Sequence, residues 1–172
     1  MVDVKANEMN VLTQLIKHSE ASKELLEKIA TFKSIRWQYP LENQLQWMKD
    51  NLESNDIHLL VYQDDKLIAY TNFVDIEVVV NKNPTKCMGI GNVCTVESGK
   101  SYGNILMNAI NNSITQNNWN GILMCKESLV SYYEKFDWIL ANTKKNEPNN
   151  LNIMTYNFYD QIGEIEYFDR NF

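Results

Sequence analysis

The first third of the chain places its apolar residues at helical spacing. In the segments 11–16 and 25–30 they recur three and four positions apart, which predicts two helices, one carrying Val11, Leu12, Leu15 and Ile16 and one carrying Leu25, Leu26, Ile29 and Ala30. Pro40 interrupts this pattern and suits the start of a third helix, whose apolar face holds Leu41, Leu45, Met48 and Leu52. Residues 2–5 are expected to form a short first strand.

The middle of the chain has the pattern of an antiparallel meander. Apolar runs at 57–62, 67–80 and 87–96 predict three strands, separated by polar turns at 63–66 and 81–84. Gly89 and Gly91 lie inside the third run, where glycine indicates a β-bulge or a close backbone approach.

The last third alternates between helix and strand patterns. A helix with Leu106, Ala109, Ile110 and Ile114 on one face precedes a buried strand at 122–125 and a short helix around 129–136. The segments 138–141 and 151–159 predict a closing hairpin around a polar loop that includes Pro148. The acidic segment 163–172 is expected to cover a sheet edge or a partner subunit. This order predicts a mixed α+β or α/β sheet in one domain.

Composition and charge narrow the classes of function. Hydrophobic residues make up 44% of the 172 and charged residues 22%, which is typical of one globular domain. A net charge of −6 argues against nucleic-acid binding, and no apolar run is long enough to span a bilayer. Cys87, Cys94 and Cys125 lack metal-site or CxxC spacing, so we expect reduced thiols in a cytoplasmic protein without a metal.

The segment "VESGKSYGNILMNAI", residues 96–110, joins a predicted strand to a predicted helix. Two glycines and a lysine at a helix N-terminus allow the backbone to approach a phosphate, although a tight turn without a ligand would use the same residues. Neither GxxxxGK[ST] nor GxGxxG is present.

Two longer stretches, "IGNVCTVESGKSYGNILMNAI" and "GILMCKESLVSYYEKFDWIL", together resemble the GCN5-related N-acetyltransferase (GNAT) family. In that family a strand leads into a loop of pattern R/Q-x-x-G-x-G/A, and a later helix carries a tyrosine in a motif similar to "YYEKFDW". The resemblance is strongest over residues 57–140. It implies a single domain over 1–172, with a mostly antiparallel central sheet flanked by helices.

This sequence departs from the family pattern at several positions. Ser98 stands at the usual Arg/Gln position, Ser101 replaces the first paired glycine, and only Gly103 is retained. Thr95 stands where a proline is frequent. Asp137 and Trp138 replace the glycine and phenylalanine that follow the tyrosine motif.

The resemblance implies acyl transfer from acetyl-CoA to an amine by direct attack in a ternary complex. Main-chain groups of Val93, Cys94 and Thr95 would pair with the pantetheine arm. The pyrophosphate would lie against Gly99, Lys100, Ser101, Tyr102, Gly103 and Asn104. Tyr133 would be the general acid for the thiolate, with Tyr132 as the alternative. A homodimer is common in the family.

The base and the acceptor stay open at this stage. Asp75, Glu77, Glu97 and His58 are candidate bases, and each also has an ordinary structural explanation. Trp37 and Tyr39 fall in a connection that often borders the acceptor site in this family, where they would suit an amine through cation–π contact. The acceptor is expected to be a small-molecule or peptide amine.

Two other classes of function remain. A sensor or pseudoenzyme would bind acetyl-CoA without turnover, and Ser98, Ser101 and Asp137 favour it. An interaction module would bind no cofactor and use the glycine loop only as a turn.

Overall fold

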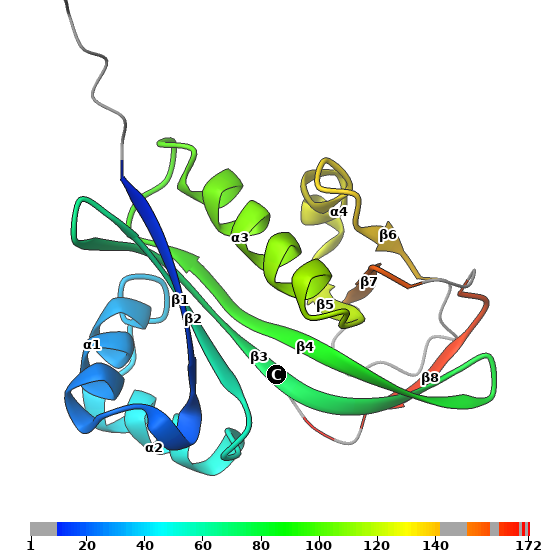
Figure 1. The fold of residues 1–172 in the computed structure, drawn as a ribbon, viewed down its shortest axis with the longest axis horizontal. Coiled ribbons are helices and arrows are strands. Elements are labelled where there is room, and N and C mark those ends of the chain that lie inside the picture. Colours follow the sequence, from blue (N-terminus) through cyan, green and yellow to red (C-terminus); the bar gives the residue numbers. More distant parts are fainter. Residues whose placement is uncertain (1–9, 142–150, 159–161, 169, 171) are drawn as a thin grey trace, which may run out of the picture.

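The computed structural model describes residues 10–141, 151–158, 162–168, 170 and 172. One central sheet has helices on both faces (Figure 1). The strands are β1 (Val11–Lys17), β2 (Ile57–Gln63), β3 (Lys66–Val80), β4 (Asn83–Thr95), β5 (Gly121–Cys125), β6 (Ile139–Leu140), β7 (Asn152–Tyr156) and β8 (Ile165–Phe168). The helices are η1 (His18–Glu20), α1 (Lys23–Lys33), α2 (Leu41–Asn51), α3 (Tyr102–Gln116) and α4 (Glu127–Glu134).

The sheet order is β1-β2-β3-β4-β5-β7-β6, and β8 pairs with β3. All pairings are antiparallel except that of β4 with β5. This confirms the predicted mixed fold with a mostly antiparallel sheet. None of the described helices is long and apolar enough to cross a membrane.

Both hairpin turns of the meander lie within the predicted polar turns 63–66 and 81–84, and each has two residues between the paired strand ends. Asp64 and Asp65 join β2 to β3, and Asn81 and Lys82 join β3 to β4. All four have positive φ, between 47° and 67°. Such turns match the right-handed twist of the flanking strands, and Asn and Asp tolerate the left-handed conformation well.

The sequence analysis predicted a helix over residues 11–16, and this prediction is wrong. Residues 11–17 form strand β1 instead. Its seven residues pair antiparallel with β2, from Val11 opposite Gln63 to Lys17 opposite Ile57. Helical spacing of two apolar pairs also places one apolar residue of each pair on each face of a strand. Pairing with β2, which no local pattern encodes, decides in favour of the strand.

The sheet separates two hydrophobic cores. Leu60, Tyr70 and Val74 face α1 and α2. Leu59, Val61 and Phe73 face α3 and α4 on the other side. Alternate residues of β2 thus point to opposite cores, as the two-residue period of a strand requires.

The C-terminal end agrees with one of its two predicted roles. β8 pairs with the second half of β3 and covers an edge that β2 leaves open. The closing hairpin is confirmed by the pairing of β6 with β7. Residues 2–5 and Pro148 lie outside the described residues.

Candidate active site

The two central parallel strands part in the middle of the sheet. β4 and β5 pair only at Met88–Gly121, Gly89–Ile122 and Ile90–Leu123. Beyond Ile90 the edge of β4 that faces β5 has no strand partner, while its other edge stays paired with β3 as far as Thr95. The main-chain groups of Val93, Cys94 and Thr95 therefore border an opening in which an extended ligand can add hydrogen bonds like those of a strand.

A β-bulge lies in β4 where the opening begins. Tyr70 pairs with Cys94 and Asn72 with Gly91, so Asn92 and Val93 stand opposite the single residue Thr71. Asn92 has a φ of 52°, and its Nδ2 donates to Asn72 Oδ1 at 2.7 Å. The Thr71 hydroxyl donates to the Gly91 carbonyl at 2.7 Å. The bulge is thus fixed by buried hydrogen bonds from β3, and the glycines in this strand predicted it.

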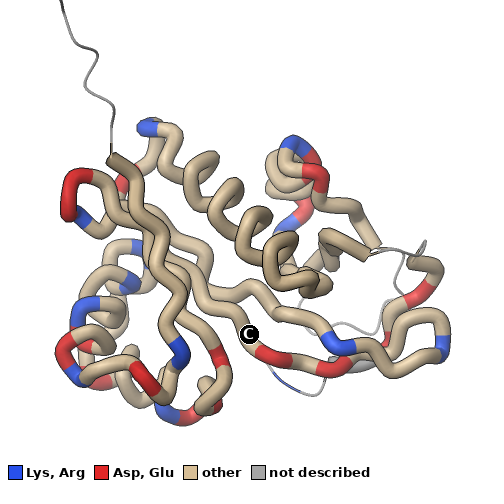
Figure 2. The backbone as a smooth tube through the Cα atoms, viewed as in Figure 1, with Lys and Arg blue, Asp and Glu red and all other residues tan. Residues whose placement is uncertain are grey.

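The loop after β4 leads to a helix end rich in unused donors. In the described part of the chain, the N–H groups of residues 97–103 donate no hydrogen bond. α3 has no acidic residue in its first turn, whereas α1, α2 and α4 each have one. The whole of α3 is free of charged residues (Figure 2). The partial positive charge at the N-terminus of α3 is therefore not neutralised by a carboxylate of the helix, and it favours the binding of an anion.

Ser101 has a left-handed backbone conformation, which glycine adopts without strain. Its φ is 59°, in the left-handed region, and its side chain makes no capping hydrogen bond. Asp137 repeats this situation after α4, with a φ of 63°. Both departures from the family pattern thus stand at left-handed positions that favour glycine, and the resulting strain is smaller for aspartate than for serine.

Gly103 lies against a tyrosine of the neighbouring helix. A Cβ atom at this position would lie 2.6 Å from Tyr132 Oη, so only glycine fits without a shift of that ring. Tyr132 in turn packs edge-on against Tyr133 and Phe136. The contact with Tyr132 therefore explains why residue 103 is a glycine, independently of whether a phosphate binds there.

The two tyrosines of α4 differ in their surroundings. Tyr133 is buried in the core beside Trp138, and burial raises the pKa of its hydroxyl to about 12. Tyr132 is half-buried, and burial also raises its pKa. Both hydroxyls are protonated at neutral pH, which is the state that a general acid requires.

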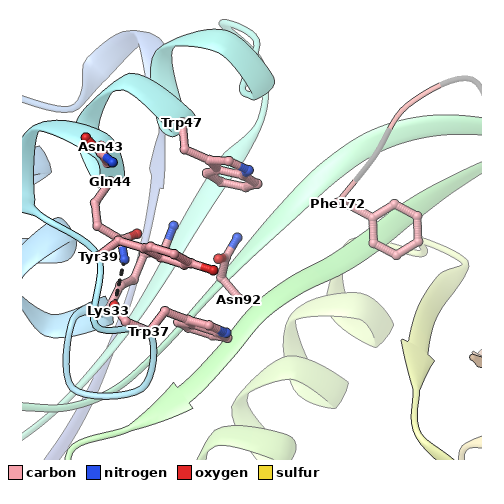
Figure 3. A pocket seen from close by; sticks show the side chains of 8 residues that line it. All are labelled: Lys33, Trp37, Tyr39, Asn43, Gln44, Trp47, Asn92 and Phe172. Carbon is pink, nitrogen blue, oxygen red and sulfur yellow. Dashed lines mark hydrogen bonds between the residues drawn. The ribbon is translucent and has the colours of Figure 1, made fainter. Parts of the chain in front are cut away.

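A pocket of about 460 Å³ lies on the α1–α2 side of the sheet. Figure 3 shows the rings of Trp37, Tyr39 and Trp47 around it, with Lys33 and Asn92 beneath. The remaining lining residues are Asn43, Gln44 and Phe172. Gln44 Nε2 donates to the Trp37 carbonyl at 2.9 Å and so fixes the connection between α1 and α2. Asn92 lines the pocket and is also part of the β-bulge in β4. The pocket therefore adjoins the bulge.

The candidate bases do not gather at this pocket. Glu97 forms an ion pair with Lys100 at 2.8 Å on the surface, and Asp75 and Glu77 are exposed on β3. His58 is fully buried, with Nε2 3.0 Å from His18 Nδ1 and Nδ1 2.8 Å from Tyr70 Oη. Burial lowers its pKa to about 4, with smaller effects of His18 and Lys33. His58 is thus a satisfied core residue, as the sequence analysis allowed.

The three cysteines are free and buried. Burial raises the pKa of the Cys87 and Cys94 thiols to about 12 and that of Cys125 to about 11. None of them is a thiolate at neutral pH, so none has the reactivity of a catalytic nucleophile.

The C-terminal segment crosses the same region of the sheet. A Cβ atom at Gly89 would lie 2.5 Å from the Phe172 ring, and one at Gly91 would lie 2.6 Å from the Phe172 carbonyl carbon. The two glycines of β4 therefore make room for this segment, which forms one wall of the pocket.

Sequence reasoning missed six pocket residues, Lys33, Asn43, Gln44, Trp47, Asn92 and Phe172. A signal existed only for Lys33, because it follows Ile29 and Ala30 by four and three positions and so falls on the buried face of α1. The residues expected at the cofactor lie along the β4 end, the following loop and the first turn of α3, and Tyr133 lies on α4.

The family follows from a sequence comparison. Residues 17–141 match the acetyltransferase (GNAT) domain, so the chain belongs to the GNAT acetyltransferase family. Among curated proteins no match was found.

Solved structures share the fold at low sequence identity. Escherichia coli ElaA is 21% identical, with a TM-score of 0.61 over 85% of this chain and 98% of that one. Campylobacter jejuni N-acetyltransferase PseH, solved with acetyl coenzyme A, is 19% identical, with a TM-score of 0.56 over 84% and 98%. Bacillus subtilis N-acetyltransferase YlbP, solved with coenzyme A, is 11% identical, with a TM-score of 0.57 over 86% and 95%.

Proposed function

We propose that this protein is an acetyl-CoA-dependent N-acetyltransferase that acts on an amine by direct attack in a ternary complex. One observation carries the proposal. The edge of β4 that is unpaired beyond Ile90 lies between the α3 end, where N–H groups donate no hydrogen bond, and Asn92, which lines the pocket. Two ligands can therefore meet at β4 from opposite sides. We propose further that residues 1–172 act as one domain, since β7 and β8 join the same sheet as the matched region.

The residues present suit coenzyme A chemically. The loop and first turn over Gly99, Lys100, Ser101, Tyr102, Gly103 and Asn104 offer main-chain donors for a pyrophosphate, and α3 offers no competing carboxylate. The unpaired edge of β4 at Val93, Cys94 and Thr95 offers donors and acceptors for the amide groups of a pantetheine arm.

The reaction requires a neutral amine, whose nitrogen attacks the thioester carbonyl carbon. A C–N bond forms, the C–S bond breaks, the amine nitrogen loses a proton and the leaving thiolate gains one. We assign the second proton to Tyr133, because its raised pKa keeps the hydroxyl protonated. Buried, protonated thiols support direct attack rather than a route through an acyl-cysteine.

The sensor alternative retains one supporting observation. Ser101 is left-handed where glycine would be unstrained, which weakens the loop that would bind the pyrophosphate. A sensor would bind acetyl-CoA and leave it intact with every amine.

Calorimetric titration with acetyl-CoA tests the proposal. Micromolar binding is expected in the wild type and its loss in Gly103→Glu, through steric clash and charge repulsion. Because a side chain at 103 also meets Tyr132 Oη, the same change is made in Tyr132→Phe, where that atom is absent. Binding by Tyr132→Phe together with loss in the double variant assigns the effect to the ligand.

If the wild type binds no acetyl-CoA, the loop is only a turn between β4 and α3, and the result supports the interaction module. Binding without turnover across an amine panel would support the sensor. A mass measurement of the native protein tests for the homodimer that is common in the family.

A further inference from the structure

Lys33 is a buried cation without an anionic partner among the residues that the structure describes. Its residue exposure is 2%, and its Nζ lies 4.2 Å from the centre of the Trp47 ring. Within the described residues, that ring is its only close partner, and no carboxylate lies within ion-pair distance. A buried ammonium is costly unless it is paired, and burial lowers the pKa of Lys33 to about 8. The amine is still mostly protonated at neutral pH.

Lys28, a second lysine of α1, also packs on an aromatic ring and serves as a comparison for Lys33. Lys28 lies 4.7 Å from the centre of the Tyr62 ring, and its Nζ donates to Tyr62 Oη at 3.4 Å. Its side chain is exposed, so its charge stays hydrated while the stem packs on the ring. Lys33 makes the same kind of ring contact, but its charge is buried in the last turn of α1.

A second unused donor lies beside the pocket. Asn72 is fully buried, and its Nδ2 has no hydrogen-bond partner among the described residues. Its Oδ1 accepts from Asn92, which lines the pocket with Lys33. Among the described residues that line this pocket there is no Asp or Glu. The described lining therefore offers a buried ammonium and amide donors, and none of its side chains is a carboxylate.

This arrangement disfavours binding of the acceptor through its ammonium group. The face of Trp47 is already occupied by Lys33, and a second cation there would meet a buried like charge. A carboxylate instead supplies the missing countercharge and oxygen acceptors. A phosphate monoester would bring about two charges and three acceptor oxygens, more than one ammonium can neutralise.

We propose that Lys33 binds a carboxylate group of the acceptor, so that the substrate class is amino acids or other amines that carry a carboxylate. The apolar part of the substrate lies between the rings of Trp37, Tyr39 and Trp47. The pocket volume of about 460 Å³ suits a ligand of that size. This inference rests on the proposed acetyltransferase function and specifies its acceptor.

The test compares amines that differ only in the carboxylate. L-phenylalanine is paired with 2-phenylethylamine, L-tryptophan with tryptamine and L-leucine with 3-methylbutylamine. For at least one pair, kcat/KM with acetyl-CoA is expected to be about tenfold or more higher for the carboxylate member. Lys33→Met is expected to abolish this preference, mainly through KM, while Lys28→Met retains it.

A binding measurement separates this inference from the acetyltransferase proposal. Binding of the N-acetylated amino acids is followed by tryptophan fluorescence without acetyl-CoA, since Trp37 and Trp47 line the pocket. Saturable binding that Lys33→Met loses supports the carboxylate site even if no turnover occurs. Equal or better use of the plain amines, an unchanged preference in Lys33→Met, or no binding or turnover of any carboxylate at millimolar concentration would overturn it.

Discussion

The guanidinium of Arg170 forms a bidentate ion pair with the carboxylate of Asp56, at 2.6 and 3.1 Å. Asp56 is 2% exposed and also accepts from the N–H groups of Glu53 and Asp75. The pair fastens the C-terminal segment to the start of β2. Phe172, two residues further on, thereby lies over Gly89 and Gly91. One buried ion pair thus positions a wall of the candidate acceptor pocket.

Arg170→Ala is expected to destabilise the protein by about 3 kcal/mol, because it leaves a buried carboxylate without its counter-ion. Urea unfolding measures the effect. Glu53→Gln serves as the control, since Glu53 contacts the same guanidinium at 3.3 Å but is exposed, and we expect a change below about 1 kcal/mol. Equal effects of the two substitutions would show that the buried pair contributes no more than the surface one.

Tyr133→Phe is expected to lower kcat by about a hundredfold or more while acetyl-CoA binding is unchanged, because a general acid contributes to the chemical step. Tyr132→Phe is the matched variant and should lower kcat by less than about tenfold. Steady-state kinetics with a competent amine measure both. The reverse ranking would transfer the role of acid to Tyr132.

Ser101→Gly is expected to raise the free energy of unfolding by about 0.5 kcal/mol, since glycine adopts the observed φ of 59° without strain but loses more entropy on folding. Tighter acetyl-CoA binding should accompany it. Ser98 lies in the same loop without a positive φ, so Ser98→Gly should give no gain. A gain in both variants would point to loop flexibility rather than strain relief.

The stability of the protein should fall between pH 6.5 and pH 4 through His58. Its pKa is lowered from 6.5 to about 4, so in this range the unfolded chain binds a proton that the folded protein does not. The stabilisation is therefore complete above pH 6.5 and is lost as the pH falls, by an amount on the order of 3 kcal/mol. Urea unfolding across this range should show a smaller slope for His58→Gln. An unchanged slope would contradict the assignment.

Lys33→Met should stabilise the protein at neutral pH, by at most about 3 kcal/mol, because burial lowers the pKa of this amine from 10.5 to about 8. Between pH 8 and pH 10.5 the unfolded chain binds more protons, so the wild type should gain stability with rising pH and the variant should not. Thermal unfolding at several pH values measures this. A destabilised variant would mean that the ammonium has a partner in the folded state.

The affinity of the protein for a carboxylate ligand should fall with rising pH, whereas its stability should rise. As the pH rises through 8, Lys33 loses the charge that the ligand requires, and Kd should increase. Tryptophan fluorescence titrations across this range measure the effect, and Lys33→Met should show no such dependence.

Much of the fold could be predicted, because its signals are local. Polar segments at 63–66 and 81–84 predicted the two hairpin turns, and glycines 89 and 91 predicted a bulge or a close backbone approach in β4. Pro40 predicted the start of α2 at Leu41. Of the candidate site, the loop 99–104 and the two tyrosines of α4 could be found, since they stand in contiguous motifs.

The acceptor pocket could not be found in this way. Lys33, Trp47 and Asn92 are far apart in the chain, and a lysine in a helix is normally a solvated residue. Only the packing of α1 and α2 against the sheet buries its ammonium beside Trp47. The placement of Phe172 likewise depends on Arg170 reaching Asp56, a contact between residues that are 114 positions apart in the chain.

The sequence by itself determined most of the helices and strands, their turns and the family, since periodicity, turn chemistry and motifs depend on residues close together in the chain. Only the tertiary structure decided that segment 11–17 is a strand, that β4 and β5 part after Ile90, and that Lys33 is a buried, unpaired cation. Each of these depends on which distant segment becomes a neighbour. That choice is made by the burial and hydrogen bonding of the whole sheet, which no local pattern records.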